Sequence, residues 1–246
     1  MKYVFFLILP ILFIQNLYGN NPIPSPTFDD ILKTIIADDK YIFDDENIIL
    51  EVPTFADNPV QVPIFADAKL IKNAKQMILF ADLNPIPIIV NMKLNELLPV
   101  ISLNIKVAQE TPLRALVLDD KNIWHIASKN IKSFGGGCSV ASVSSSGEDF
   151  AKLLGKTKVN VFESNGIYRI KSSIFHPMET GLIFGNNEFY INKILVKADD
   201  KNIAEISTYS AISENPRFIF ETKIKADNYK IEFYDIDGNQ FFVETK

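Results

Sequence analysis

The sequence predicts an all-β protein made of two antiparallel β-sandwich domains, with one short helix ahead of the first. Short apolar or alternating segments, bounded by proline, asparagine or glycine, recur along the chain at fairly even spacing. Hydrophobic residues make up 47% of the 246 residues, which is enough to bury large cores. A segment rich in glycine and serine, residues 134–156, divides the predicted strands into two groups.

The amino-terminal residues predict an export signal. Lys2 supplies a positive charge, an apolar run follows from Val4 to Ile14, and Gly19 offers a small residue at a plausible cleavage point. The run is shorter than the roughly 20 apolar residues of a membrane-spanning helix, although an uncleaved anchor is the alternative. We therefore expect residues 1–20 to be a cleaved signal peptide, a periplasmic or extracellular location, and no stable membrane insertion after cleavage.

One amphipathic helix is predicted over residues 28–37. Thr27 is the expected capping residue, and Asp29 and Asp30 in the first turn favour the helix dipole. Apolar residues recur at helical spacing, at Phe28, Ile31, Leu32, Ile35 and Ile36. This pattern predicts a helix packed against a larger element.

Strand patterns then fill both parts of the chain. The first domain, residues 27–133, has predicted strands at 48–52, 60–64, 76–83, 88–94, 100–108, 113–118 and 122–128. The second, residues 157–246, has predicted strands at 158–162, 167–174, 189–197, 203–209, 217–225, 229–234 and 240–244. Pro63 indicates an edge position, and Asp237-Gly238 predicts a hairpin turn. Both groups are typical of immunoglobulin-like sandwiches joined by a flexible linker.

Cys138 is the only cysteine and lies in that linker. Gly135, Gly136 and Gly137 precede it, and together they predict a flexible arm that presents a reactive thiol. Lys132, six positions upstream, is too distant in sequence to ensure contact with the thiol. A lone exported cysteine that is not reactive would be a buried, inert residue or would form an intermolecular disulfide in a homodimer.

Several motifs resemble a known family. His176-Pro-Met-Glu-Thr-Gly181 follows a predicted strand, and Ile212-Ser-Glu-Asn-Pro-Arg-Phe218 and Asp235-Ile-Asp-Gly238 come later in the same half. The first half contains Asn84-Pro-Ile-Pro87 after a strand and ends in Gly-Gly-Cys. In this order, the motifs resemble the fused SoxYZ-like carriers found beside quinoprotein dehydrogenases, with a SoxY-like half before a SoxZ-like half.

This resemblance implies a covalent carrier of sulfur intermediates of the thiosulfate or sulfane type. Cys138 would carry them between periplasmic sulfur-oxidation enzymes, c-type cytochromes or a quinoprotein dehydrogenase. The chain departs from the family pattern because Ser139-Val140-Ala141, not glycines, follow the cysteine. The arm also continues into a second domain instead of ending.

The residues favour no enzyme class, so we expect no catalytic residue, cofactor or metal. The net charge of −5 and the lack of a lysine and arginine cluster argue against nucleic-acid binding. His125 and His176 lack the spacing of zinc ligands, and we expect His176 to shape a loop. A non-covalent docking or chaperone module for an exported dehydrogenase or cytochrome is the alternative function.

Overall fold

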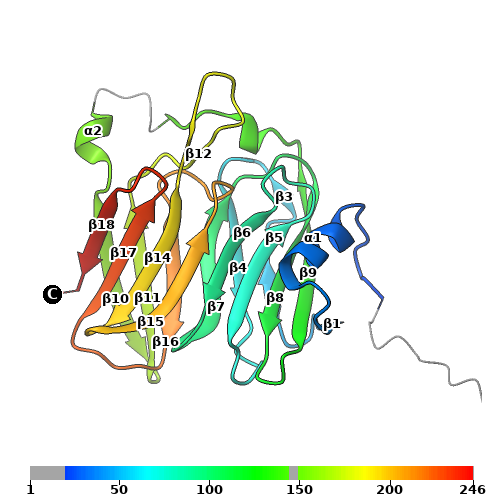
Figure 1. Cartoon of the computed structure of the whole chain (residues 1–246), viewed down its shortest axis with the longest axis horizontal. Helices are drawn as coiled ribbons and strands as arrows, with labels where there is room; N and C mark the ends of the chain where they lie inside the picture. Colours follow the sequence, from blue (N-terminus) through cyan, green and yellow to red (C-terminus); the bar gives the residue numbers. More distant parts are fainter. Residues whose placement is uncertain (1–19, 144–148, 246) are drawn as a thin grey trace, which may run out of the picture.

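The computed structural model describes residues 20–143 and 149–245, and it consists of two facing β-sheets with little helix (Figure 1). The helical elements are α1 (Phe28–Ile36), the 3-10 turn η1 (Gly137–Ser139) and α2 (Phe150–Leu153). The strands are β1 (Tyr41–Phe43), β2 (Ile49–Glu51), β3 (Phe55–Ala56), β4 (Val62–Asp67), β5 (Gln76–Ala81), β6 (Ile88–Lys93), β7 (Leu97–Ile105), β8 (Thr111–Leu118), β9 (Trp124–Ser133), β10 (Thr157–Ser164), β11 (Ile167–Ile174), β12 (Glu179–Thr180), β13 (Glu188–Phe189), β14 (Ile191–Ala198), β15 (Lys201–Thr208), β16 (Arg217–Thr222), β17 (Tyr229–Asp235) and β18 (Gln240–Glu244). The all-β sandwich predicted from the sequence is confirmed.

The two sheets differ in size. The larger has the strand order β1-β9-β8-β5-β6-β15-β14-β17-β18, and β3 also pairs with β9. The smaller has the order β10-β11-β16-β7-β4-β2. Pairings are antiparallel except those of β1 and β3 with β9. A separate ribbon of β12 and β13 rises from one end of the sandwich (Figure 1).

Both sheets continue from the first half of the chain into the second. In the larger sheet β6 pairs with β15, which places Met92 opposite Ile206. In the smaller sheet β7 pairs with β16, which places Ser102 opposite Ile219. One buried apolar cluster extends through both halves. The two halves therefore lie side by side in shared sheets, an arrangement that the sequence left open.

Helix α1 covers the larger sheet over β5, β8 and β9 (Figure 1). Its buried residues are Phe28, Leu32 and Ile36, in agreement with the predicted apolar face. Thr27 is the N-cap residue, as expected, but its side chain makes no capping hydrogen bond, because its hydroxyl donates to the backbone oxygen of Asp82 at 2.6 Å. The Thr27 side chain therefore connects the helix start to the end of β5.

A buried ion pair lies beneath this helix. Arg114 of β8 and Asp82 have fully buried side chains, and Nη2 of the arginine is 2.7 Å from Oδ2 of the aspartate. The guanidinium carbon is 4.6 Å from the ring centroid of Phe28. The sheet surface under α1 thus combines apolar packing with a paired charge.

Two local predictions are confirmed by the strand pairing. Gly238, with φ of 85°, lies in the turn between the antiparallel strands β17 and β18. Pro63 of β4 faces β7 on one side, whereas β2 on the other side reaches only residues 65–67. The proline therefore occupies a locally unpaired edge. Within the described residues, no helix has the length and apolarity needed to cross a membrane.

Candidate functional site

Cys138 lies in η1 at the end of the molecule that carries β12, and its side chain is 0% exposed. The sequence predicted an accessible thiol on a mobile segment, and the structure corrects this expectation. Cys138 is unpaired, but it is covered by both halves of the chain. Its role as an attachment point stays a prediction.

The glycines before Cys138 are hydrogen-bonded to the first half. Gly136 N–H donates to the carbonyl oxygen of Ala108 at 2.9 Å, and Gly137 N–H donates to that of Val107 at 3.0 Å. Gly135 and Gly136 both have φ of +86°, a conformation that favours glycine. The expected flexible arm of Gly135, Gly136 and Gly137 is therefore docked in this structure. Its glycines are needed for the turn and for the close fit.

The second half holds the residues around and after the cysteine. Thr180 of β12 donates its hydroxyl hydrogen to the carbonyl oxygen of Cys138 at 2.9 Å. Ser142 donates its N–H to Oε1 of Glu179 at 3.0 Å, and its hydroxyl to Oε2 of Glu214. The arm, which we define as residues 134–142, thus closes over the line where the two halves meet.

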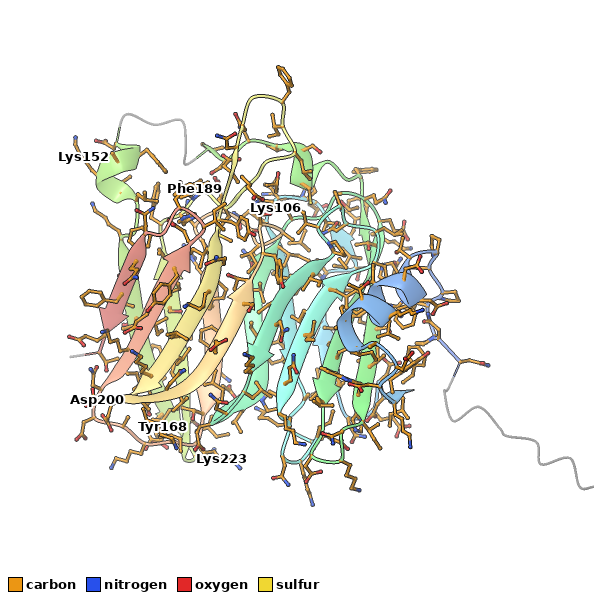
Figure 2. The ribbon with its side chains drawn as sticks, viewed as in Figure 1. Lys106, Lys152, Tyr168, Phe189, Asp200 and Lys223 are labelled. Carbon is orange, nitrogen blue, oxygen red and sulfur yellow. The ribbon has the colours of Figure 1, made fainter. Side chains whose placement is uncertain are left out.

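Lys106 lies at this junction, directly after β7, and is only 4% exposed (Figure 2). Its ammonium donates to the carbonyl oxygen of Met178 and, at 3.0 Å, to that of Ser210, so a side chain from the first half is bound by the second. Burial lowers the pKa of Lys106 to about 8, although the Glu179 and Glu214 carboxylates, and a negative charge on Cys138 when it is present, oppose the shift. The residue therefore retains most of its charge at neutral pH.

The docked thiol is not nucleophilic. Burial raises the pKa of Cys138 to about 11, and the Lys106 ammonium only partly offsets this effect. Since the thiolate is the reacting form, Cys138 must leave this position before it can react at neutral pH. Sequence analysis considered the exposed Lys132 and missed Lys106. The available signal was a lysine between the apolar residues Ile105 and Val107.

His176 is also buried near Lys106, and it lies against Phe189 at 4.5 Å between ring centroids. Its Nδ1 accepts a hydrogen bond from Met178 N–H at 3.2 Å, and its Nε2 is 3.5 Å from Oδ2 of Asp235 without forming a hydrogen bond. Burial lowers the pKa of His176 to about 4, against the opposing effect of the Asp235 carboxylate. The neutral imidazole thus fixes the loop that carries Met178, which matches the loop-shaping role expected for it.

The second histidine, His125, lies near the start of β9, at the opposite end of this strand from the arm, and contacts two carboxylates. Its Nδ1 is 2.6 Å from Oδ2 of Asp44, and its Nε2 is 3.5 Å from Oδ2 of Asp119. The hydrogen bond with His125 helps to lower the pKa of Asp44 against the effect of burial. Over residues 20–143 and 149–245, no three side chains of metal-binding type converge on one point.

The two halves of the chain match two protein-family models. The family model of the sulfur oxidation protein SoxY matches residues 32–138, so the match ends at Cys138. The model of the sulphur oxidation protein SoxZ matches residues 158–246. No curated protein sequence matches the chain.

Solved structures were compared as well. The sulfur carrier protein SoxY from Chlorobium limicola f thiosulfatophilum is 19% identical with a TM-score of 0.38, over 44% of this chain and 96% of that one. A β-glucuronidase from Parabacteroides merdae is 8% identical with a TM-score of 0.25, over 82% of this chain and 24% of that one. The two family models together cover the region from α1 to the carboxyl-terminal strand, apart from the segment between Cys138 and β10. The chain therefore belongs to the SoxY and SoxZ families of sulfur-oxidation proteins, with both domains fused in one polypeptide.

Proposed function

We propose that this protein is a periplasmic covalent carrier whose Cys138 accepts sulfur intermediates of the thiosulfate or sulfane type. Membership of the SoxY and SoxZ families supports a carrier role in sulfur oxidation, and the proposed role is not catalytic. One observation supports Cys138 most directly: the only cysteine of the chain coincides with the end of the SoxY match. A carrier needs a single attachment point, and this residue is the one available thiol.

Transfer requires the arm to undock. The bonds that must break are weak individually, since a typical intramolecular hydrogen bond contributes about 0.5–1.5 kcal/mol net. Gly135 and Gly136 supply freely rotating backbone on one side of the thiol. Once in solvent, Cys138 regains a pKa of about 8.5 and a useful thiolate fraction. The docked state thus protects the thiol, and the undocked state reacts.

The surface around the arm fits a protein partner. Phe134 is 94% exposed and Phe184, in the loop between β12 and β13, is fully exposed, at 104%. Val140 and Leu182 are exposed as well, and we call these four residues the apolar rim. Exposed apolar residues that gather around a functional segment are typical of interaction sites. The proposed partners are sulfur-oxidation enzymes, c-type cytochromes or a quinoprotein dehydrogenase.

The test is intact mass spectrometry of the protein isolated from its native compartment, before and after reductant. A carrier shows added sulfur, sulfite or thiosulfate mass on Cys138 that reductant removes at least in part. The Cys138→Ser variant should fold normally, carry no such mass and fail to support sulfur oxidation. A bare thiol in cells that are oxidising sulfur compounds would contradict the proposal.

A non-covalent docking module is the second candidate. It is favoured by the complete burial of Cys138 and by the pKa of about 11 of its thiol. In that case Cys138→Ser would leave function intact, and a complex with the partner would survive the substitution. Activity of the Cys138→Ser variant therefore separates the two functions.

A further inference from the structure

The buried ammonium of Lys106 has no anionic partner among the residues that the structure describes. Two carbonyl oxygens accept from it, those of Met178 and Ser210, and no carboxylate in the described ranges forms an ion pair with it within 4.0 Å. An ammonium has three N–H donors, so one is left after these two bonds. The Glu179 and Glu214 carboxylates act on this ammonium from beyond ion-pair distance, and a negative charge in direct contact with it would stabilise the buried charge further.

Cys138 is the position from which such an anion can be supplied. Gly137, the residue before Cys138, donates its N–H at 3.0 Å to the carbonyl oxygen of Val107, which directly follows Lys106. The Lys106 ammonium donates to the carbonyl oxygen of Met178, two residues before the Thr180 that binds the Cys138 carbonyl oxygen. At this position the ammonium lowers the pKa of the Cys138 thiol against the effect of burial. The empty thiol is neutral in the docked state, so it offers no compensation. Glu179 and Glu214 act on Lys106 at longer range and are hydrogen-bonded to Ser142. His176, whose Nε2 lies 3.5 Å from Oδ2 of Asp235, is close enough to Lys106 for the ammonium to help lower the pKa of the imidazole.

We propose that Lys106 is a specificity-determining residue of the docked carrier site, where its ammonium binds an anionic group carried on Cys138. This inference rests on the proposed carrier function and adds the chemical class of cargo that the docked arm retains. Persulfide, thiosulfonate and sulfonate groups on sulfur all bear a negative charge at neutral pH. A neutral adduct of the same size gains nothing from Lys106.

A consequence is that the charge of the cargo sets the position of the arm. A group that interacts with only one of two conformations shifts the population toward that conformation. An anionic cargo pairs with Lys106 only when the arm is docked, so it favours docking. A neutral cargo has no such preference, and the arm that carries it spends more time in solvent.

Two reagents load Cys138 with matched groups of different charge. Tetrathionate reacts with the thiolate to form a Cys–S–S–SO3⁻ adduct and releases thiosulfate, which takes the electron pair of the broken S–S bond. Methyl methanethiosulfonate reacts to form a Cys–S–S–CH3 adduct and releases methanesulfinate in the same way. Because Cys138 is the only cysteine, intact mass confirms each product.

Hydrogen exchange of the segment 134–142 reports docking directly. The amides of Gly136, Gly137 and Ser142 are hydrogen-bonded in the docked state and become free when the arm leaves. In the wild type, the anionic adduct should exchange about tenfold more slowly than the neutral adduct, the scale of one partly buried charge pair. Equal exchange of the two adducts in the wild type would overturn the proposal.

Three variants assign the effect to Lys106. Lys106→Gln removes the charge but keeps a donor for a carbonyl oxygen, and it should abolish the difference between the adducts. Lys106→Arg keeps the charge and should preserve the difference. Lys132→Gln, a change at the exposed lysine close to Cys138 in sequence, should also preserve it. A difference that survives in Lys106→Gln would show that another group binds the anion.

The outcomes separate this inference from the carrier function. Reversible loading of Cys138 with no effect of adduct charge leaves the carrier intact and refutes the role of Lys106. Failure of both reagents to load native wild-type protein refutes the carrier and the role of Lys106 together. If Lys106→Gln does not fold, equal exchange of the two adducts in the wild type still refutes the role of Lys106.

Discussion

A Cβ atom on Gly137 would lie 2.1 Å from the carbonyl oxygen of Pro59, far inside van der Waals contact. The carbonyl oxygen of Val107 would lie 2.8 Å from the same atom. Both neighbours are backbone, so neither can move aside as a flexible side chain would. The position of Cys138 in the junction therefore depends on the absence of a side chain at the preceding residue.

Gly137→Ala should release the arm. Overpacking of this kind costs about 1–3 kcal/mol, so the alkylation rate of Cys138 should rise roughly tenfold or more. The rate is measured with a neutral alkylating reagent under native conditions. Gly136→Ala is the comparison, since nothing lies within 4 Å of its added Cβ and only backbone strain at φ of +86° is introduced. An unchanged rate in Gly137→Ala would mean that the thiol reacts without undocking.

Thr180→Val should also expose the thiol, but less. The substitution removes the hydrogen bond to the Cys138 carbonyl oxygen with little change of shape, which corresponds to roughly 1 kcal/mol or about fivefold in alkylation rate. Thr222→Val is a matched control, because the Thr222 hydroxyl donates to the carbonyl oxygen of Glu96 at 2.8 Å, away from the arm. Both variants should lose similar stability, and only Thr180→Val should change the thiol. Equal alkylation rates in the two variants would argue against the contact.

Stability should fall as the pH drops from about 6.5 to about 4, because of His176. The folded-state pKa of His176 is about 4, below the ordinary value near 6.5, so the unfolded chain binds a proton in this window and the folded chain does not. From pH 6.5 to pH 5 the loss should be about 1–2 kcal/mol in the free energy of urea unfolding. Carboxylates with lowered pKa, such as Glu232, act only below about pH 4.5. His176→Gln should therefore flatten the upper part of the profile, and an unchanged slope would show that other groups titrate there.

Asp82→Ala should destabilise the protein by about 3–5 kcal/mol, because it leaves the buried Arg114 guanidinium without its counter-charge. The double change Asp82→Leu with Arg114→Met should recover much of this loss, since it removes both charges. Chemical denaturation of the three proteins measures the effect. If Asp82→Ala lost no more stability than the double variant, this would indicate that water or another group solvates the arginine.

Local pattern was sufficient for most strands but not for their pairing. The predicted segment 167–174 coincides with β11, and 240–244 coincides with β18, because alternation and turn residues mark both. Short strands such as β1 and β12 were missed, as two or three residues carry no period. The sequence pattern of β6 does not reveal whether the strand beside it comes from its own half, as β5 does, or from the other half, as β15 does. The sequence therefore could not predict that the two halves share their sheets.

The site was predicted in its residues but not in its environment. Cys138 and its glycines were identified from composition, and glycine was taken as a sign of mobility. The structure uses Gly137 for close packing instead, which a sequence does not distinguish from flexibility. Lys106, Thr180 and Glu214 reach Cys138 or its arm only through the fold, because each is distant along the chain.

The order of the residues around Cys138 has a consequence for biosynthesis. Thr180, Glu179 and Glu214, which hold the arm, all follow the cysteine in the chain and are therefore made after it. A nascent chain thus carries a bare thiol with an ordinary acidity until its second half has folded back onto the first. During this interval the thiol of Cys138, the only cysteine, is accessible to oxidants. The folding of the second half is therefore the step that encloses the thiol.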